Sequence, residues 1–217
     1  MGKPIQKLLK TNWSKLLLLI LVIFYTVGTV GLLLPERKEY FLSLSFFNLT
    51  LSFVILVLAR KKNLFLFFIF LIICFIVGFS AELIGTRTGW LFGSYYYGNN
   101  LGYKIYGVPL VIGLNWGILI VTSASIANLF KFSNTVKVIL SVLLMILLDY
   151  LMEPVAIKSD FWHWKNETIP IYNYISWGLI ALPLQIIYFK FKIVETNIVF
   201  NALFIILSMF FIILNLF

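Results

Sequence analysis

Residues 64–82 read LFLFFIFLIICFIVGFSAE, an apolar run of eighteen residues followed directly by the carboxyl group of Glu82. A helix needs about 20 apolar residues to cross a bilayer, so this run predicts a membrane span. Its position places Glu82 at or just below the membrane interface, where the cost of an ionisable group falls from about 3 kcal/mol at the bilayer centre. The run indicates the fold class, and the acid that ends it is the first candidate for chemistry.

The same apolar character recurs along the whole chain. Of 217 residues, 62% are apolar and 12% are charged, whereas an average soluble domain has roughly 45–50% and 25%. This composition excludes a soluble enzyme, a disulfide scaffold and a disordered chain. Seven apolar windows lie at about 16–34, 40–59, 64–81, 105–130, 134–152, 174–189 and 197–217. We therefore predict one all-α integral-membrane domain over residues 1–217, a polytopic bundle of about seven transmembrane helices.

Two prolines bear on the shape of the fifth and sixth predicted helices. Pro154 follows Glu153, so we expect the fifth helix to end there, with Asp149 and Glu153 in its last turn. Pro183 is expected to kink the short sixth helix. The single cysteine, Cys74, lies inside an apolar run and is expected to behave as a small buried hydrophobe.

The formal charge of +9 indicates membrane topology better than nucleic-acid binding, because the basic residues lie in the gaps between apolar windows. Alternating connections divide the 17 Lys and Arg residues into eleven and six, and the larger group includes Lys3, Lys7 and Lys10. The bias predicts a cytoplasmic N-terminus in a multi-pass protein of the cytoplasmic membrane. The first window is of full span length without an Ala-x-Ala site, which favours a helix over a cleaved signal peptide.

Two long connections, residues 82–104 and 153–173, are predicted to emerge on one face, the extracytoplasmic one. With the helix ends that bracket them they hold five of the eight acids and the only histidine: Glu82, Asp149, Glu153, Asp160, Glu167 and His163. The other acids, Glu36, Glu39 and Glu195, lie in short connections beside basic residues, and we expect them to be solvated.

Three carboxyl groups are the main candidates for catalysis. Asp149 and Glu153 are four residues apart, so they share one helix face with β-carbons about 6 Å apart and can share one proton. The alternative is that Asp149 alone is buried against Arg87 or a lysine. Glu82 is either a desolvated proton donor or a helix-end carboxylate paired with Arg87 in water.

Aromatic residues crowd both long connections. Trp162 and Trp164 flank His163. They can anchor the chain at the headgroups, line a slot for an extended hydrocarbon or stabilise a cation through their π-faces. His163 can move protons or act as a structural hydrogen-bonding residue. The glycine-punctuated stretch 85–98 predicts a helix seam, a re-entrant turn or a pocket wall, since irregular backbone at membrane depth must be buried or line a cavity.

No metal or cofactor motif is evident. One histidine and scattered carboxylates do not match zinc or di-iron spacing, although Glu82, Asp149 and Glu153 would offer a divalent ion oxygen ligands if they converged. Signatures for nucleotides, flavins and haem are also absent, so we expect chemistry without an organic cofactor.

Several runs together resemble one known family. They are AELIGTRTG at 81–89, FGSYYY at 92–97, KIYGVP at 104–109, LDYLMEPVA at 148–156, DFWHW at 160–164 and IYNY at 171–174. In this order they resemble the membrane-integral carotenoid hydratases, a family of carotenoid biosynthesis proteins, over residues 81–185. The resemblance implies addition of water to the terminal double bond of an acyclic carotenoid end, which gives a tertiary alcohol.

That reaction needs an acid to protonate the alkene and an acceptor for the proton of water. We hypothesise that one of Glu82 and the Asp149/Glu153 pair is the acid and another the base, with Asp160 in reserve. An acyclic or monocyclic carotenoid would lie between helices in the bilayer, and other carotenoid-pathway enzymes are possible partners. Its expected contacts are Arg87, Trp90, Phe92, Tyr95, Tyr97, Asn115, Trp116, Trp162, His163 and Trp164.

Two other functions fit the same residues. Intramembrane carboxylates also mark proton-coupled transporters, which would carry polar residues through both halves of the bilayer. A non-catalytic scaffold for pigment-synthesising enzymes would leave the carboxyls solvated and apart. The acids gather at one end of the chain's helices, which favours a one-sided pocket.

Overall fold

The computed structural model describes the chain from Lys3 to Phe217, with side chains from Asn12 onward. The side chains of Lys3, Lys7 and Lys10, which contribute to the predicted orientation, lie outside this part. The described helices are α1 (Lys3–Leu33), α2 (Lys38–Ser43), α3 (Ser45–Ala59), α4 (Leu64–Thr88), α5 (Leu110–Ala127), α6 (Asn134–Lys158), α7 (Ile171–Lys190) and α8 (Ile198–Leu216). Four short strands join them: β1 (Tyr95–Tyr97), β2 (Lys104–Ile105), β3 (Val108–Pro109) and β4 (Trp162–Trp164).

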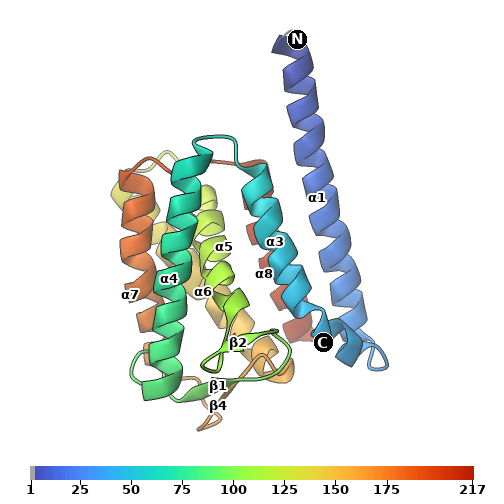
Figure 1. Ribbon diagram of the computed structural model, residues 1–217, viewed down its shortest axis with the longest axis vertical. Coiled ribbons are helices and arrows are strands. Elements are labelled where there is room, and N and C mark those ends of the chain that lie inside the picture. The colour runs from blue at the N-terminus through green and yellow to red at the C-terminus, as the bar shows by residue number, and fades with distance from the viewer. Residues whose placement is uncertain (1–2) are drawn as a thin grey trace.

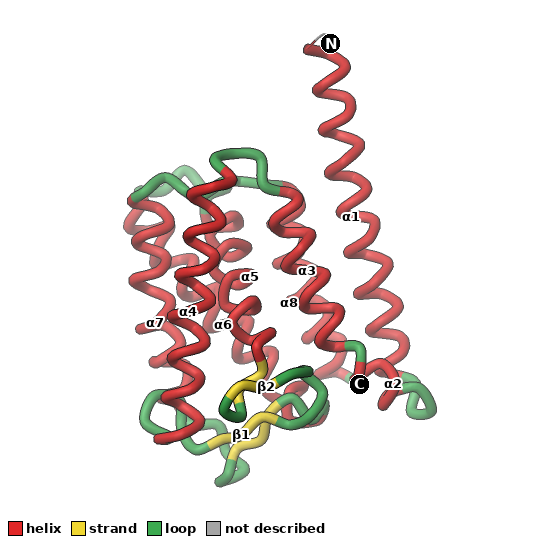
Figure 2. The backbone as a smooth tube through the Cα atoms, in the orientation of Figure 1, coloured by secondary structure: helices red, strands yellow, loops and turns green. Residues whose placement is uncertain are grey.

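The long helices run up and down in one bundle, with all four strands at the end away from the start of α1 (Figures 1 and 2). Helix α5 lies at the centre and packs against α3, α4, α6, α7 and α8. Its apolar window is 83% buried, against 28–33% in the other apolar helices of span length. Glycine, alanine and serine residues of α5 leave room for its neighbours, so the bundle closes around it.

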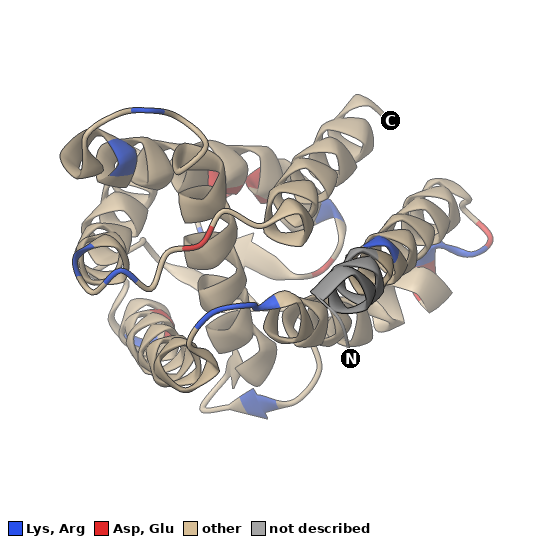
Figure 3. Cartoon of the chain, turned by 90° about the horizontal axis from the view of Figure 1, so that it is seen from above, with Lys and Arg blue, Asp and Glu red and all other residues tan. Residues whose placement is uncertain are grey.

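The outward faces of the bundle are apolar, which is the arrangement of a multi-pass membrane protein. Five described helices are long and apolar enough to cross a bilayer: residues 12–33, 64–88, 110–127, 134–158 and 198–216. Helix α3 is apolar but has 15 residues, about 22 Å against a hydrocarbon core of about 30 Å. Every predicted window contains a helix, and the count of seven spans stays a prediction. Lys and Arg lie at the periphery and in the connections (Figure 3).

The predicted start of the fourth helix, at about residue 105, is wrong. Strands β2 and β3 form a hairpin there, and α5 begins only at Leu110. Tyr106 and Gly107 both have positive φ, 51° and 88°, which a two-residue hairpin turn of type I′ requires. The Lys104 ammonium donates to the Tyr97 carbonyl at 2.9 Å and ties this hairpin to β1.

The predicted end of the fifth helix is also wrong. Helix α6 continues through Pro154 to Lys158, so Asp149 and Glu153 come before its last turn and not within it. Pro154 deprives the Tyr150 carbonyl of its helical partner. Val155 and Ala156 are buried in the core, however, and their packing holds the next turn in place. Helix α7 likewise continues through Pro183.

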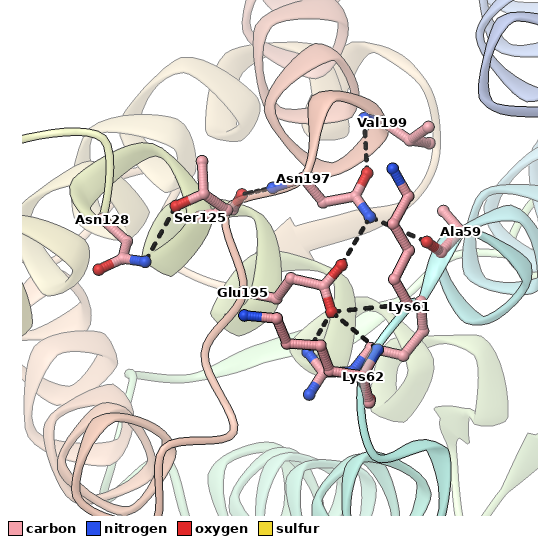
Figure 4. Close-up of polar contacts among 10 residues, drawn as sticks. Ala59, Lys61, Lys62, Ser125, Asn128, Glu195, Asn197 and Val199 are labelled. Carbon is pink, nitrogen blue, oxygen red and sulfur yellow. Dashed lines mark hydrogen bonds and ion pairs between the residues drawn. The ribbon is translucent and has the colours of Figure 1, made fainter. Parts of the chain in front are cut away.

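Glu195 is buried, which contradicts the expectation that it is solvated. Its carboxylate lies 3.4 Å from the Arg60 guanidinium, and both side chains are almost fully buried. The carboxylate also accepts hydrogen bonds from the Lys62 backbone and from the Asn197 amide (Figure 4). Asn197 in turn donates to the Ala59 carbonyl. These contacts join the α3–α4 and α7–α8 connections at the end of the bundle opposite the strands.

We expect Glu195→Gln to destabilise the protein, because it leaves the buried Arg60 cation without its anion. The loss should be about 3–5 kcal/mol, as for other broken buried pairs. Thermal unfolding in detergent measures it. The matched control is Glu39→Gln, an exposed acid whose change should stay within about 0.5 kcal/mol. Equal unfolding temperatures for the two variants would contradict a stabilising role of the pair.

Candidate active site

The two long connections meet at one end of the bundle, as predicted. Strand β1 pairs antiparallel with β4, with Tyr95 opposite Trp164 and Tyr97 opposite Trp162. Successive side chains of a strand point to opposite faces. The four rings therefore point together into the bundle, where they are buried, whereas Tyr96 and His163 face outward.

Glu82 lies beneath β1 and is surrounded by donors. Its Oε2 accepts hydrogen bonds from the hydroxyls of Tyr95 at 2.5 Å and Tyr97 at 2.7 Å. Its Oε1 accepts one from the Trp116 indole at 3.2 Å. Burial, and next the charge of Glu82, raise the pKa values of both tyrosine hydroxyls well above their ordinary value. Both hydroxyls thus keep their protons and act as donors toward the carboxyl.

Asp149 and Glu153 share one face of α6, as their spacing predicts. Oε2 of Glu153 accepts from the indoles of Trp162 at 3.0 Å and Trp164 at 2.8 Å. The Asn173 amide donates both to Asp149 Oδ2, at 3.0 Å, and to Glu153 Oε1, at 3.3 Å. Asp149 Oδ1 has no partner among the described residues, although Asp149 is fully buried.

The three carboxyl groups surround one small cavity. Its volume is about 20 Å³, which is room for about one water molecule. Polar groups of the wall can give such a water two or more hydrogen bonds, so the position suits a held water rather than an empty apolar void. The other wall residues are Phe92, Tyr95, Tyr97, Ile112, Asn115, Met152, Trp162, Trp164, Asn173 and Trp177.

A glycine in α4 sets how close Trp116 comes to Glu82. A β-carbon at Gly78 would lie 2.2 Å from the Trp116 ring, closer than packed atoms approach. The indole therefore packs closely against α4 and reaches Glu82, one turn further along the helix. It also stacks on Trp177 of α7, with ring centres 4.2 Å apart and planes at 10°. The stack connects three helices around the carboxyl.

The structure brings together most of the residues predicted for the site. Nine of them line the cavity: Glu82, Asp149, Glu153, Phe92, Tyr95, Tyr97, Asn115, Trp162 and Trp164. Trp116 is not part of the wall, but its indole donates a hydrogen bond to Glu82, which is. Glu82 is not a solvated helix-end carboxylate, because α4 continues to Thr88 and buries it. Arg87 is exposed and lies over the Tyr106 ring, so it pairs with neither Glu82 nor Asp149.

Four predicted site residues lie away from the cavity wall: Arg87, Trp90, Asp160 and His163. Trp90 is 84% exposed. Asp160 accepts from the Asn99 backbone at 2.9 Å and contacts the His163 ring at 2.7 Å. These two contacts hold the pKa of Asp160 below its usual value. Asp160 therefore joins the two long connections to each other from the outside.

Two residues of α7 are missing from the sequence-based site. Asn173 bridges two carboxyls, and Trp177 covers Trp116. Their spacing of four residues places them on one helix face. This spacing, and the place of Asn173 in the IYNY run at 171–174, were the available signals. An apolar helix with one asparagine and one tryptophan does not reveal by itself that this face meets the acids of α6.

The donors around the carboxyls also bear on cation binding. Tyrosine, tryptophan and asparagine donors occupy oxygen positions that a divalent ion would need. Among the described residues, no group of three or more His, Cys, Asp or Glu side chains is arranged to hold a metal ion.

Comparisons with known proteins agree with the motifs of residues 81–185. A family model described as carotenoid biosynthesis protein matches residues 40–217. A bisanhydrobacterioruberin hydratase from Haloarcula japonica is 27% identical in an alignment of 197 positions that covers 79% of this chain and 64% of that relative. The chain thus aligns with less than two thirds of the relative's length. No solved structure matches the chain. Because the family match covers most of the chain, including every carboxyl of the cavity, the protein belongs to the carotenoid biosynthesis protein family.

Proposed function

We propose that the protein is a carotenoid hydratase that adds water, without a cofactor, to the terminal double bond of an acyclic carotenoid end. The observation that carries this proposal is the cavity for about one water molecule among three buried carboxyl groups. The family match and the hydratase relative support it. A buried polar pocket inside a membrane bundle suits a substrate that is itself dissolved in the bilayer.

Asp149 is the proposed proton donor. Glu82 and Glu153 each accept three hydrogen bonds from fixed donors. Asp149 accepts one, and its other oxygen has no partner among the described residues. Hydrogen bonds from fixed donors stabilise a carboxylate anion. A neutral Asp149 between two such groups has a proton to give. The proton adds to the terminal alkene as its π bond breaks, which leaves a tertiary carbocation.

Water then captures the cation. The water oxygen forms a bond to the tertiary carbon, and one of its protons passes to a carboxylate, so the products are a tertiary alcohol and a regenerated acid. Glu153 is the proposed acceptor, because Asn173 holds it next to Asp149 and a proton can return between them. The carboxylate of Glu82 and the faces of Trp162 and Trp164 stabilise the passing positive charge.

The same proposal includes the membrane in which the protein acts and the enzymes with which it exchanges substrate. The protein would act in the cytoplasmic membrane, with the site toward the extracytoplasmic side, and would exchange carotenoids with other enzymes of their synthesis. A scaffold without catalysis would have solvated, separate carboxyls. The buried and converging carboxyls found here favour the enzyme.

The proposal predicts a new pigment in cells that accumulate an acyclic carotenoid such as lycopene. Expression of the chain should yield a product heavier by one water, or by two if both ends react, detected by chromatography and mass spectrometry. Cells that express Asp149→Asn are the control. An unchanged pigment profile with the protein present in the membrane would contradict hydration of that substrate.

Amide substitutions test the assigned roles. Asp149→Asn removes the proton donor, and we expect a rate loss of at least 100-fold, the lower range for general acid catalysis. Glu153→Gln and Glu82→Gln should each lose activity by a similar factor. Asp160→Asn should lose less than tenfold, because Asp160 only joins the connections, and the exposed Glu39→Gln should match the wild type. Initial rates with purified protein in lipid measure this series. Full activity of Asp149→Asn would refute its role.

A further inference from the structure

A second cavity adjoins the carboxyl cavity on the side of α1, α3 and α8. Its volume is about 60 Å³, and its wall is mainly apolar: Tyr25, Leu49, Leu101, Leu119, Phe161, Leu207 and Phe211 are among its residues. Four residues belong to the walls of both cavities, namely Ile112, Asn115, Met152 and Trp162. These four side chains are therefore the partition between the two spaces.

A third cavity continues from the second toward the lipid. Its volume is about 260 Å³, and it shares Ser45, Asn48 and Phe210 with the second cavity. Its outer wall includes Ile23, Phe24 and Val27 of α1, which are about half exposed on the apolar surface. Three consecutive cavities thus connect the membrane-facing surface of α1 with the three carboxyls.

We propose that these cavities form a lateral entry route, in which the polyene chain of the substrate lies between α1 and α3 while its end group reaches the carboxyls. The proposal rests on the proposed function for its substrate class. The occupant is the apolar chain behind the reacting end, because the route adjoins the carboxyl cavity across the partition and its walls are mainly apolar. A chain that enters in this way never crosses water.

The partition carries one polar side chain for which no hydrogen bond is found among the described residues. This side chain is Asn115, which is 7% exposed and belongs to the walls of both cavities. Buried polar groups normally have a partner, so this amide is available to the water or to the new hydroxyl group. Its neighbour Met152 is flexible, which suits a partition that a ligand must pass. The partition can therefore let the end of the carotenoid pass and can form a hydrogen bond with its new hydroxyl group.

The route can be blocked without disturbing the core. A β-carbon at Gly28, in the third cavity, meets no atom within 4 Å. Gly28→Phe should therefore place a ring in this third cavity. Ile23→Trp fills the same cavity from a second position that is already half exposed. These two substitutions are the groove variants. The matched control is Val22→Phe, which adds a ring on α1 at a half-exposed residue that lines none of the three cavities.

The experiment measures two quantities in each variant. The first is the pigment that co-purifies with the protein from carotenoid-accumulating cells, and the second is the hydration rate with a full-length carotenoid and with a ten-carbon isoprenoid that has the same end group. We expect Gly28→Phe and Ile23→Trp to lose at least tenfold in bound pigment and in rate with the long substrate. The rate with the short one, and both quantities in Val22→Phe, should stay near wild type.

The outcomes separate the two proposals. Wild-type pigment binding by both groove variants, or no pigment bound by the wild-type protein, would overturn the route. Pigment that binds to the wild type, is lost in the groove variants and is never hydrated would support the route and refute the hydratase function. Equal losses for Val22→Phe would also overturn the route, because that ring lies outside it.

Discussion

Three carboxyl groups lie inside an apolar bundle, and supplying them with hydrogen bonds is the constraint on which the rest of the structure depends. A carboxylate moved away from water without partners costs several kcal/mol or more. Here the partners come from the pairing of β1 with β4, which directs two tyrosines toward Glu82 and two tryptophans toward Glu153. The strand pair thus closes the end of the bundle over the carboxyl cavity, and it also supplies four of the hydrogen-bond donors to the carboxyl groups. Asn173 supplies the remaining link between the acids of α6.

The two ends of the bundle solve the same problem in different ways. At the end opposite the strands, Glu195 is neutralised by Arg60 and fully occupied by backbone and amide donors. That arrangement leaves no oxygen for a ligand and holds the connections together. At the strand end, no described Lys or Arg side chain lines the cavity of the three carboxyls, and one Asp149 oxygen has no partner among the described residues. A cavity remains between the three groups. A closed ion pair stabilises a fold, whereas an open cluster of acids beside a water-sized cavity suits proton transfer.

The acids could be located from the sequence because they are rare in an apolar chain. The aromatic residues of the site could be located because they gather in the two long connections. Sequence reasoning failed where a local rule met tertiary packing. Pro154 is a helix terminator by its own chemistry, yet the buried residues after it keep α6 intact. Glu195 stands beside basic residues, which suggests a solvated charge, yet Arg60 folds onto it from a distant part of the chain. Strands of two or three residues carry too little alternation to be recognised between apolar windows.

The sequence by itself determined the membrane bundle, the approximate positions of its helices, the common face of the two long connections and the pairing of Asp149 with Glu153 on one helix face. These follow from hydrophobicity and from the 3.6-residue repeat, which are local properties of the chain. Only the tertiary structure decided that Glu82 joins that pair, that Asn173 bridges it, and that Arg87, Asp160 and His163 stay outside. Glu82 and Glu153 line one cavity although they are 71 positions apart in the chain. These tertiary contacts depend on the register of β1 with β4 and on the close approach of α4 to α5 at Gly78, which no local pattern specifies.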